Sequence, residues 1–151
     1  MLLDGEYVRK VLGKTITGGY GHADLKRVFA AFENPAEMAR WMGQPGSKTE
    51  VQALDVREGG AVRVEMSWDS GMCIRLHGTF QRVERPRLLE FTWAMEGDDA
   101  NKGVVTVEFA PHETGTELTL THEGLTGPAL KQSRAGWNGW FDRMQNLVEA
   151  S

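Results

Sequence analysis

Apolar and polar residues alternate along the middle of the chain. In residues 61–68, Val62, Val64, Met66 and Trp68 share one face, while the residues between them are mostly polar or charged. A period of two is typical of a strand with one buried face. The same pattern between turn residues predicts strands at 49–56, 72–83, 88–95, 104–110 and 116–123, with a first strand within 6–17. The expected inward face of strand 72–83 is Met72, Ile74, Leu76 and Phe80. The expected inward face of strand 88–95 is Leu89, Phe91, Trp93 and Met95.

Helical spacing replaces this alternation in three segments. Residues 23–32 carry Leu25, Val28, Phe29 and Phe32 on one face. Asn34-Pro35 ends that helix and begins a second one over 36–42, because proline suits a first helical turn and asparagine caps it. The third helix begins at Gly127-Pro128 and runs to about residue 149, roughly 33 Å at 1.5 Å per residue. Its apolar stripe is Leu130, Trp137, Phe141, Met144 and Val148.

The order of these elements predicts an α+β fold in one domain, residues 1–151. Strands that follow one another in sequence usually pair, which favours an antiparallel meander. A sheet with one apolar face needs a cover, and only the last helix is long enough to provide it. We therefore expect a curved antiparallel sheet of about six or seven strands wrapped on the C-terminal helix, with two short helices after the first strand. An apolar pocket is expected between sheet and helix.

The composition narrows the classes of function. The chain has 151 residues, 40% hydrophobic and 25% charged, as in ordinary globular proteins. Its net charge of −4, with basic residues scattered among acids, argues against nucleic acid as a partner. The sequence shows no run of 18 apolar residues and no secretory signal pattern, so no membrane partner is expected. The single cysteine, Cys73, suits a reducing, cytoplasmic location.

Several segments resemble a known family. They are residues 28–32 with 34–41, the turn at 57–60, Gly78-Thr79-Phe80, residues 85–93 and 115–125, and Gly136-Trp137. In this order, over about residues 23–150, they are similar to the activator of heat-shock-protein-90 ATPase homologues, within the START-like, polyketide-cyclase-like (SRPBCC) superfamily. The resemblance implies a helix-grip fold with a cavity under the C-terminal helix. It implies no particular reaction, since relatives include lipid carriers, cyclases and co-chaperones.

Aromatic residues and methionines gather on the faces expected to converge. Ligand pockets are mainly apolar, and methionine suits adaptable surfaces, but a solid core has the same composition. The sequence leaves both interpretations open. The candidate pocket residues are Trp41, Met66, Trp68, Leu76, Phe91, Trp93, Met95, Val107, Leu120, His122, Trp137, Phe141 and Met144.

His122 is the inward-facing residue with the most chemistry. It could anchor a ligand or act as a general acid or base, because its ordinary pKa is near neutrality. The alternative is a hydrogen-bonded core histidine. Arg134 either reaches the pocket mouth or extends to water. The other histidines are expected on the outer face (His77), in a turn (His112) and in a loop (His22).

No metal site or cofactor is expected, because the histidines are widely spaced. Cys73 has no nearby base in the sequence, so a nucleophilic role is not favoured for it. The leading hypothesis is a protein that binds a small hydrophobic or amphipathic molecule between sheet and helix. The alternatives are a co-chaperone-like activator of an ATPase with a chaperone partner, and a cyclase- or hydrolase-like enzyme using the same cavity. An enzyme is the less favoured interpretation, no catalytic residue is assigned, and a homodimer is left open.

Overall fold

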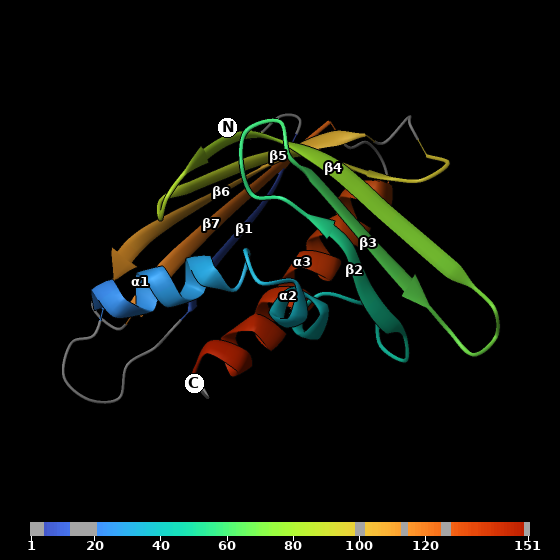
Figure 1. Cartoon of the computed structure of the whole chain (residues 1–151), viewed down its shortest axis with the longest axis horizontal. Coiled ribbons are helices and arrows are strands. Elements are labelled where there is room, and N and C mark those ends of the chain that lie inside the picture. The colour runs from blue at the N-terminus through green and yellow to red at the C-terminus, as the bar shows by residue number, and fades with distance from the viewer. Residues whose placement is uncertain (1–4, 13–20, 99–101, 113–114, 125–127, 150–151) are drawn as a thin grey trace.

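The strands predicted from alternation form one curved antiparallel sheet (Figure 1). The computed structural model describes residues 5–12, 21–98, 102–112, 115–124 and 128–149. In this part the strands are β1 (Gly5–Leu12), β2 (Lys48–Leu54), β3 (Ala61–Ser67), β4 (Cys73–Glu84), β5 (Leu88–Met95), β6 (Gly103–His112) and β7 (Gly115–Glu123). Their order, β1-β7-β6-β5-β4-β3-β2, makes β2 to β7 a meander with β1 beside β7. The predicted fold class is confirmed.

The six strands predicted between residues 49 and 123 lie within two residues of their expected bounds. The first strand, expected within residues 6–17, is β1, and residues 13–17 of that span lie outside the described residues. Alternation located the strands well because each has one face against a core, which fixes its register.

The curvature of the sheet has local causes. The pairing register shifts between Val51 and Ala53 on β2, and between Phe80 and Arg82 on β4. An extra residue of this kind bends a strand and increases its twist. At Gly78 on β4 an added Cβ would lie 1.7 Å from the carbonyl oxygen of Thr92 on β5. Only glycine allows the two strands to approach so closely at this point.

Two short helices close one end of the sheet. They are α1 (Gly21–Ala30) and α2 (Pro35–Trp41). Asn34 caps α2, because its Oδ1 accepts hydrogen bonds from the amides of Ala36 (2.9 Å) and Glu37 (3.2 Å). Both predicted helices are found, but α1 begins earlier than expected. The backbone of His22 therefore lies in a helix and not in the predicted loop.

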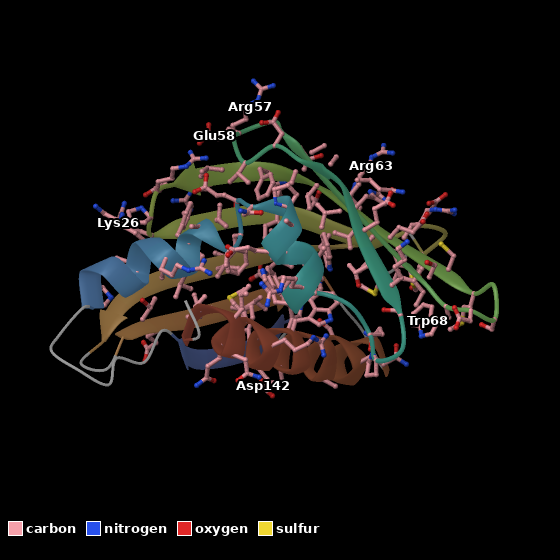
Figure 2. All side chains as sticks on the ribbon, turned by 60° about the horizontal axis from the view of Figure 1, so that its bottom comes forward. Lys26, Arg57, Glu58, Arg63, Trp68 and Asp142 are labelled. Carbon is pink, nitrogen blue, oxygen red and sulfur yellow. The ribbon has the colours of Figure 1, made fainter. Side chains whose placement is uncertain are left out.

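The C-terminal helix α3 (Pro128–Glu149) crosses the concave side of the sheet, as predicted (Figure 1). Its buried residues are Trp137, Trp140, Phe141, Met144, Leu147 and Val148. Trp137 contacts Trp93 of β5 with ring centroids 6.1 Å apart, and Phe141 contacts Trp41 of α2 at 6.4 Å. Asp142 on α3 and Arg63 on β3 point away from the interior on opposite sides of the molecule (Figure 2). None of the helices in the described residues is long and apolar enough to cross a membrane.

The hairpin between β3 and β4 extends beyond the core. Met72, expected on the inner face of its strand, is 54% exposed and precedes β4. Trp68, expected to line the pocket, follows β3 and is only partly buried. Its indole Nε1–H donates to the carbonyl of Pro45 at 3.2 Å, so it packs on the turn before β2. Alternation gave these residues the right parity, but none of the described helices covers the tip of the hairpin.

Candidate functional site

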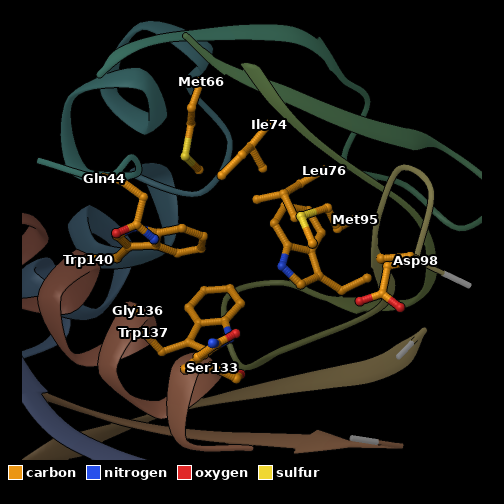
Figure 3. Close-up of a pocket in the computed structure, with 13 residues that line it drawn as sticks. Gln44, Met66, Ile74, Leu76, Met95, Asp98, Ser133, Gly136, Trp137 and Trp140 are labelled. Carbon is orange, nitrogen blue, oxygen red and sulfur yellow. The ribbon is translucent and has the colours of Figure 1, made fainter. Parts of the chain in front are cut away.

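A cavity of about 280 Å³ lies between the N-terminal half of α3 and strands β3 to β5 (Figure 3). Residues of the sheet, of α3, of the segment after α2 and of the segment after β5 surround it. Apolar side chains form most of the wall. The lining residues are Gln44, Met66, Ile74, Leu76, Trp93, Ala94, Met95, Asp98, Gln132, Ser133, Gly136, Trp137 and Trp140.

The helix side of the cavity is set by spacing along α3. Ser133, Gly136, Trp137 and Trp140 are three or four residues apart and therefore share a helix face. The rings of Trp137 and Trp140 meet edge to face, with centroids 4.9 Å apart. The Trp140 Nε1–H donates to the carbonyl of Gly43 at 3.0 Å, which fixes that ring beside the segment that carries Gln44. Gly136 lies between these side chains and leaves room beside Gln44.

His122 of β7 makes hydrogen bonds to two residues of this wall. Its Nδ1 lies 2.8 Å from the Ser133 hydroxyl and 3.3 Å from the indole Nε1 of Trp137. An indole N–H can only donate, so Nδ1 must be the unprotonated, accepting nitrogen. The Ser133 hydroxyl therefore also donates its proton to Nδ1. The imidazole proton lies on Nε2, which is buried and has no hydrogen-bond partner among the described residues.

Burial keeps this imidazole neutral. His122 is 4% exposed, and desolvation lowers its pKa from 6.5 to about 4. Its Nε2 faces Gly103 of β6, where an added Cβ would lie 2.9 Å from that nitrogen. A general base works best with a pKa near the operating pH, and is usually oriented by a second polar group. The arrangement therefore suits hydrogen-bond positioning of Ser133 and Trp137 and does not suit proton abstraction.

Comparison with known proteins identifies the family. The sequence profile described as "Activator of Hsp90 ATPase homolog 1-like protein" matches residues 22–149. The chain belongs to this family. Comparison with curated proteins yields no match.

Several solved structures share the fold of this chain. A protein from Chromobacterium violaceum is 25% identical with a TM-score of 0.81, covering 97% of this chain and 99% of its own. An AHSA1-like protein from Aeromonas hydrophila is also 25% identical, with a TM-score of 0.72 and coverage of 97% and 92%. A protein from Rhodobacter sphaeroides shares the fold at 19% identity, with a TM-score of 0.80 and coverage of 97% and 93%.

In this family member, some of the residues predicted to form a pocket line the cavity and others fill the core. Met95 lines the mouth and is 39% exposed, because it ends β5. Trp41 and Phe91 border only a void of about 10 Å³, the size of one water molecule. The predicted residues that line the cavity are Met66, Leu76, Trp93, Met95 and Trp137. Those that lie fully buried in the core, away from the cavity, are Val107, Leu120, Phe141 and Met144.

The sequence prediction missed the polar edge of the cavity and one of its three indole rings. Trp140 follows Trp137 by three residues, so continuing the helical stripe at both spacings would have included it. Ser133 precedes Trp137 by four residues on the same face, but a lone serine carries no pattern of its own. Gln44, Asp98 and Gln132 lie at segment ends or on the exposed side of α3, where neither alternation nor helical periodicity applies.

The remaining candidates lie apart from the cavity. Cys73 is exposed, and partial desolvation is the main reason that the pKa of its thiol is raised, the opposite of an activated nucleophile. His77 of β4 lies opposite Arg63 of β3 in the antiparallel pairing of these two strands. Among the described residues no three metal-binding side chains come together. The side chains of Leu130, Arg134 and His112 lie outside the described part of the structure.

Proposed function

We propose that this protein binds a small hydrophobic or amphipathic molecule in the cavity beneath the N-terminal half of α3. One observation carries the proposal: a cavity of about 280 Å³ whose walls are mainly indole, aliphatic and thioether groups, with a few polar groups at its edge. Binding sites for small molecules combine an apolar wall with a few polar groups that orient the ligand. The volume is just below the usual range of about 300–1,000 Å³, which favours a small ligand.

The cavity wall is held in place before any ligand binds. His122 accepts from Ser133 and Trp137, and the carbonyl of Gly43 accepts from Trp140. Arg143 also donates to the carbonyls of Trp41 and Gly43, tying the segment after α2 to α3. A wall fixed in this way loses little conformational entropy on binding, which supports affinity for a small molecule.

Native mass spectrometry of the gently purified protein tests the proposal, together with a calorimetric titration with 1-octanol. We expect a retained small molecule or saturable binding at one site per chain. Gly136→Leu would place a side chain in the cavity and abolish binding. Gly139→Leu is the matched control, because a Cβ at that position meets nothing within 4 Å. Binding that is unaffected by Gly136→Leu would place the ligand elsewhere, and absence of any binding would overturn the proposal.

A second candidate function is activation of a chaperone ATPase. The observation that favours it is the family match over residues 22–149, whose description names an activator of the Hsp90 ATPase. Calorimetry with the Hsp90 protein of the same organism, followed by its ATPase rate, tests this function. Binding that raises the rate and survives Gly136→Leu would separate it from ligand binding. No heat of binding would exclude it.

A further inference from the structure

The proposed binding site, on which this inference rests, offers its ligand hydrogen-bond acceptors at Ser133. The Ser133 hydroxyl gives its only proton to His122 Nδ1 at 2.8 Å, because that nitrogen already accepts from the Trp137 indole. A hydroxyl has one proton and two lone pairs. Ser133 therefore presents lone pairs to the cavity that it lines. A ligand group beside it must donate.

The indole rings favour the same kind of ligand. Three tryptophans line the cavity, at positions 93, 137 and 140. The N–H groups of Trp137 and Trp140 are turned away from the cavity toward His122 and the carbonyl of Gly43. What these two rings offer a ligand is their π-electrons, which attract cations within about 6 Å of the ring centre.

The charge carried by the described cavity lining has the matching sign. Asp98 is the only ionisable residue among the lining side chains that the structure describes, and it lies at the mouth (Figure 3). Basic residues of the neighbouring strands alternate onto the outer face, where Arg75 pairs with Glu65 at 2.8 Å. Arg143 lines a neighbouring groove, and its guanidinium donates to backbone carbonyls. An anionic head group in the cavity would lose its hydration without gaining a described cationic partner there.

We propose that the ligand is a cationic amphiphile, a hydrophobic body with a protonated amine that donates to Ser133 and lies among the indole rings near Asp98. The cavity is then selective for the sign of charge as well as for apolar surface. His122 acts as a positioning residue, because it holds the Ser133 proton away from the ligand.

Three ligands with the same chain and different heads test this selectivity: octylammonium, 1-octanol and octanoate. Each is titrated calorimetrically at about pH 7.5, where the amine is cationic and the acid anionic. We expect octylammonium to bind about tenfold more tightly than octanoate, with 1-octanol between them. Ser133→Ala and Asp98→Asn should each reduce the ratio between octylammonium and octanoate.

Asp69→Asn is the control for the general attraction of a cation to an acidic protein. It removes one carboxylate from the β3–β4 hairpin, outside the cavity lining, and should leave the ratio unchanged. If 1-octanol binds but octanoate binds as tightly as octylammonium, the charge selectivity is wrong and the binding function stands. An equal fall of the ratio in Asp69→Asn and Asp98→Asn would also overturn it. If none of the three ligands binds, both proposals fail.

Discussion

The two halves of α3 face the same sheet, but one half packs into a filled core and the other borders a cavity. Residues 141–148, the filled half, place Phe141 and Met144 in a core with no exposed surface. Residues 132–140, the open half, border the cavity. The difference arises from what lies beside the helix. At the filled half, α2 adds Trp41 and the turn before it adds Phe32, and both rings contact Phe141.

No such helix accompanies the open half in the described residues. There the segment after α2 passes alongside, tied to α3 by Trp140 and Arg143, and β3 to β5 continue beyond the cover that the short helices provide. A sheet longer than its helical cover leaves apolar surface that no described side chain fills. The cavity is thus a consequence of the lengths and positions of the elements, and the following tests compare the two halves.

Matched leucine truncations should show the largest contrast. Leu120→Ala removes a fully buried side chain of β7, and we expect it to lower the free energy of unfolding by about 3–5 kcal/mol. Leu76→Ala removes a partly exposed side chain of the cavity wall and should cost about 1 kcal/mol or less, because it already borders empty space. Urea denaturation of both variants provides the measurement. Equal losses would mean that the cavity wall is packed as tightly as the core.

Acid should destabilise the protein through the histidine that supports the open half. The pKa of His122 is lowered to about 4 in the folded chain, whereas its ordinary value is 6.5. Between these values the unfolded chain binds the proton and the folded chain does not, so stability falls as the pH falls. Between about pH 7 and about pH 5 we expect a loss of about 2 kcal/mol from this residue.

Urea denaturation at both pH values, repeated on His122→Gln, isolates this contribution. The variant should be less stable at neutral pH but should lose about 2 kcal/mol less on acidification than the unaltered chain. Glu65 also has a lowered pKa, through its hydrogen bond to Arg75, but its contribution is lost only below its ordinary value of 4.5. An identical pH dependence of both proteins would show that His122 is solvated.

The fold could be predicted from the sequence because the buried face of each strand or helix places apolar residues at a regular spacing. Alternation in residues 61–67 and helical spacing of Trp137, Phe141 and Met144 each report which face meets the core. The inward direction of His122 followed from the same parity, and it is confirmed by its burial. A long helix over a meander then leaves few arrangements open.

The position of the cavity could not be predicted in the same way. Periodicity identifies a buried face but does not show whether the space opposite is filled. Trp41 was expected to line the pocket, yet it is fully buried and its Nε1–H donates to the carbonyl of Ala31 at 2.9 Å. The contact of Ser133 with His122 depends on how far α3 is shifted along β7. That shift is set by the packing of the whole core and leaves no local signal.

Substitution of glycine by alanine should give the smallest differences in stability between the open half and a closely packed site. Gly136 and Gly139 lie inside α3, where glycine costs about 1 kcal/mol relative to alanine. A Cβ at Gly136 would be 4.0 Å from Gln44 Nε2, and one at Gly139 would meet nothing within 4 Å. We therefore expect Gly136→Ala and Gly139→Ala each to raise the free energy of unfolding by about 0.5–1 kcal/mol.

Gly103→Ala is the counterpart on β6, because its Cβ would lie 2.3 Å from the carbonyl oxygen of Glu123 and 2.9 Å from His122 Nε2. It should destabilise the protein and shift the histidine, whereas the two helix variants should do neither. Thermal unfolding, with the imidazole signals followed by NMR, distinguishes these outcomes. A loss of stability in Gly136→Ala would mean that the space between α3 and Gln44 is already closed, and the cavity would then be too small to admit a ligand at this end.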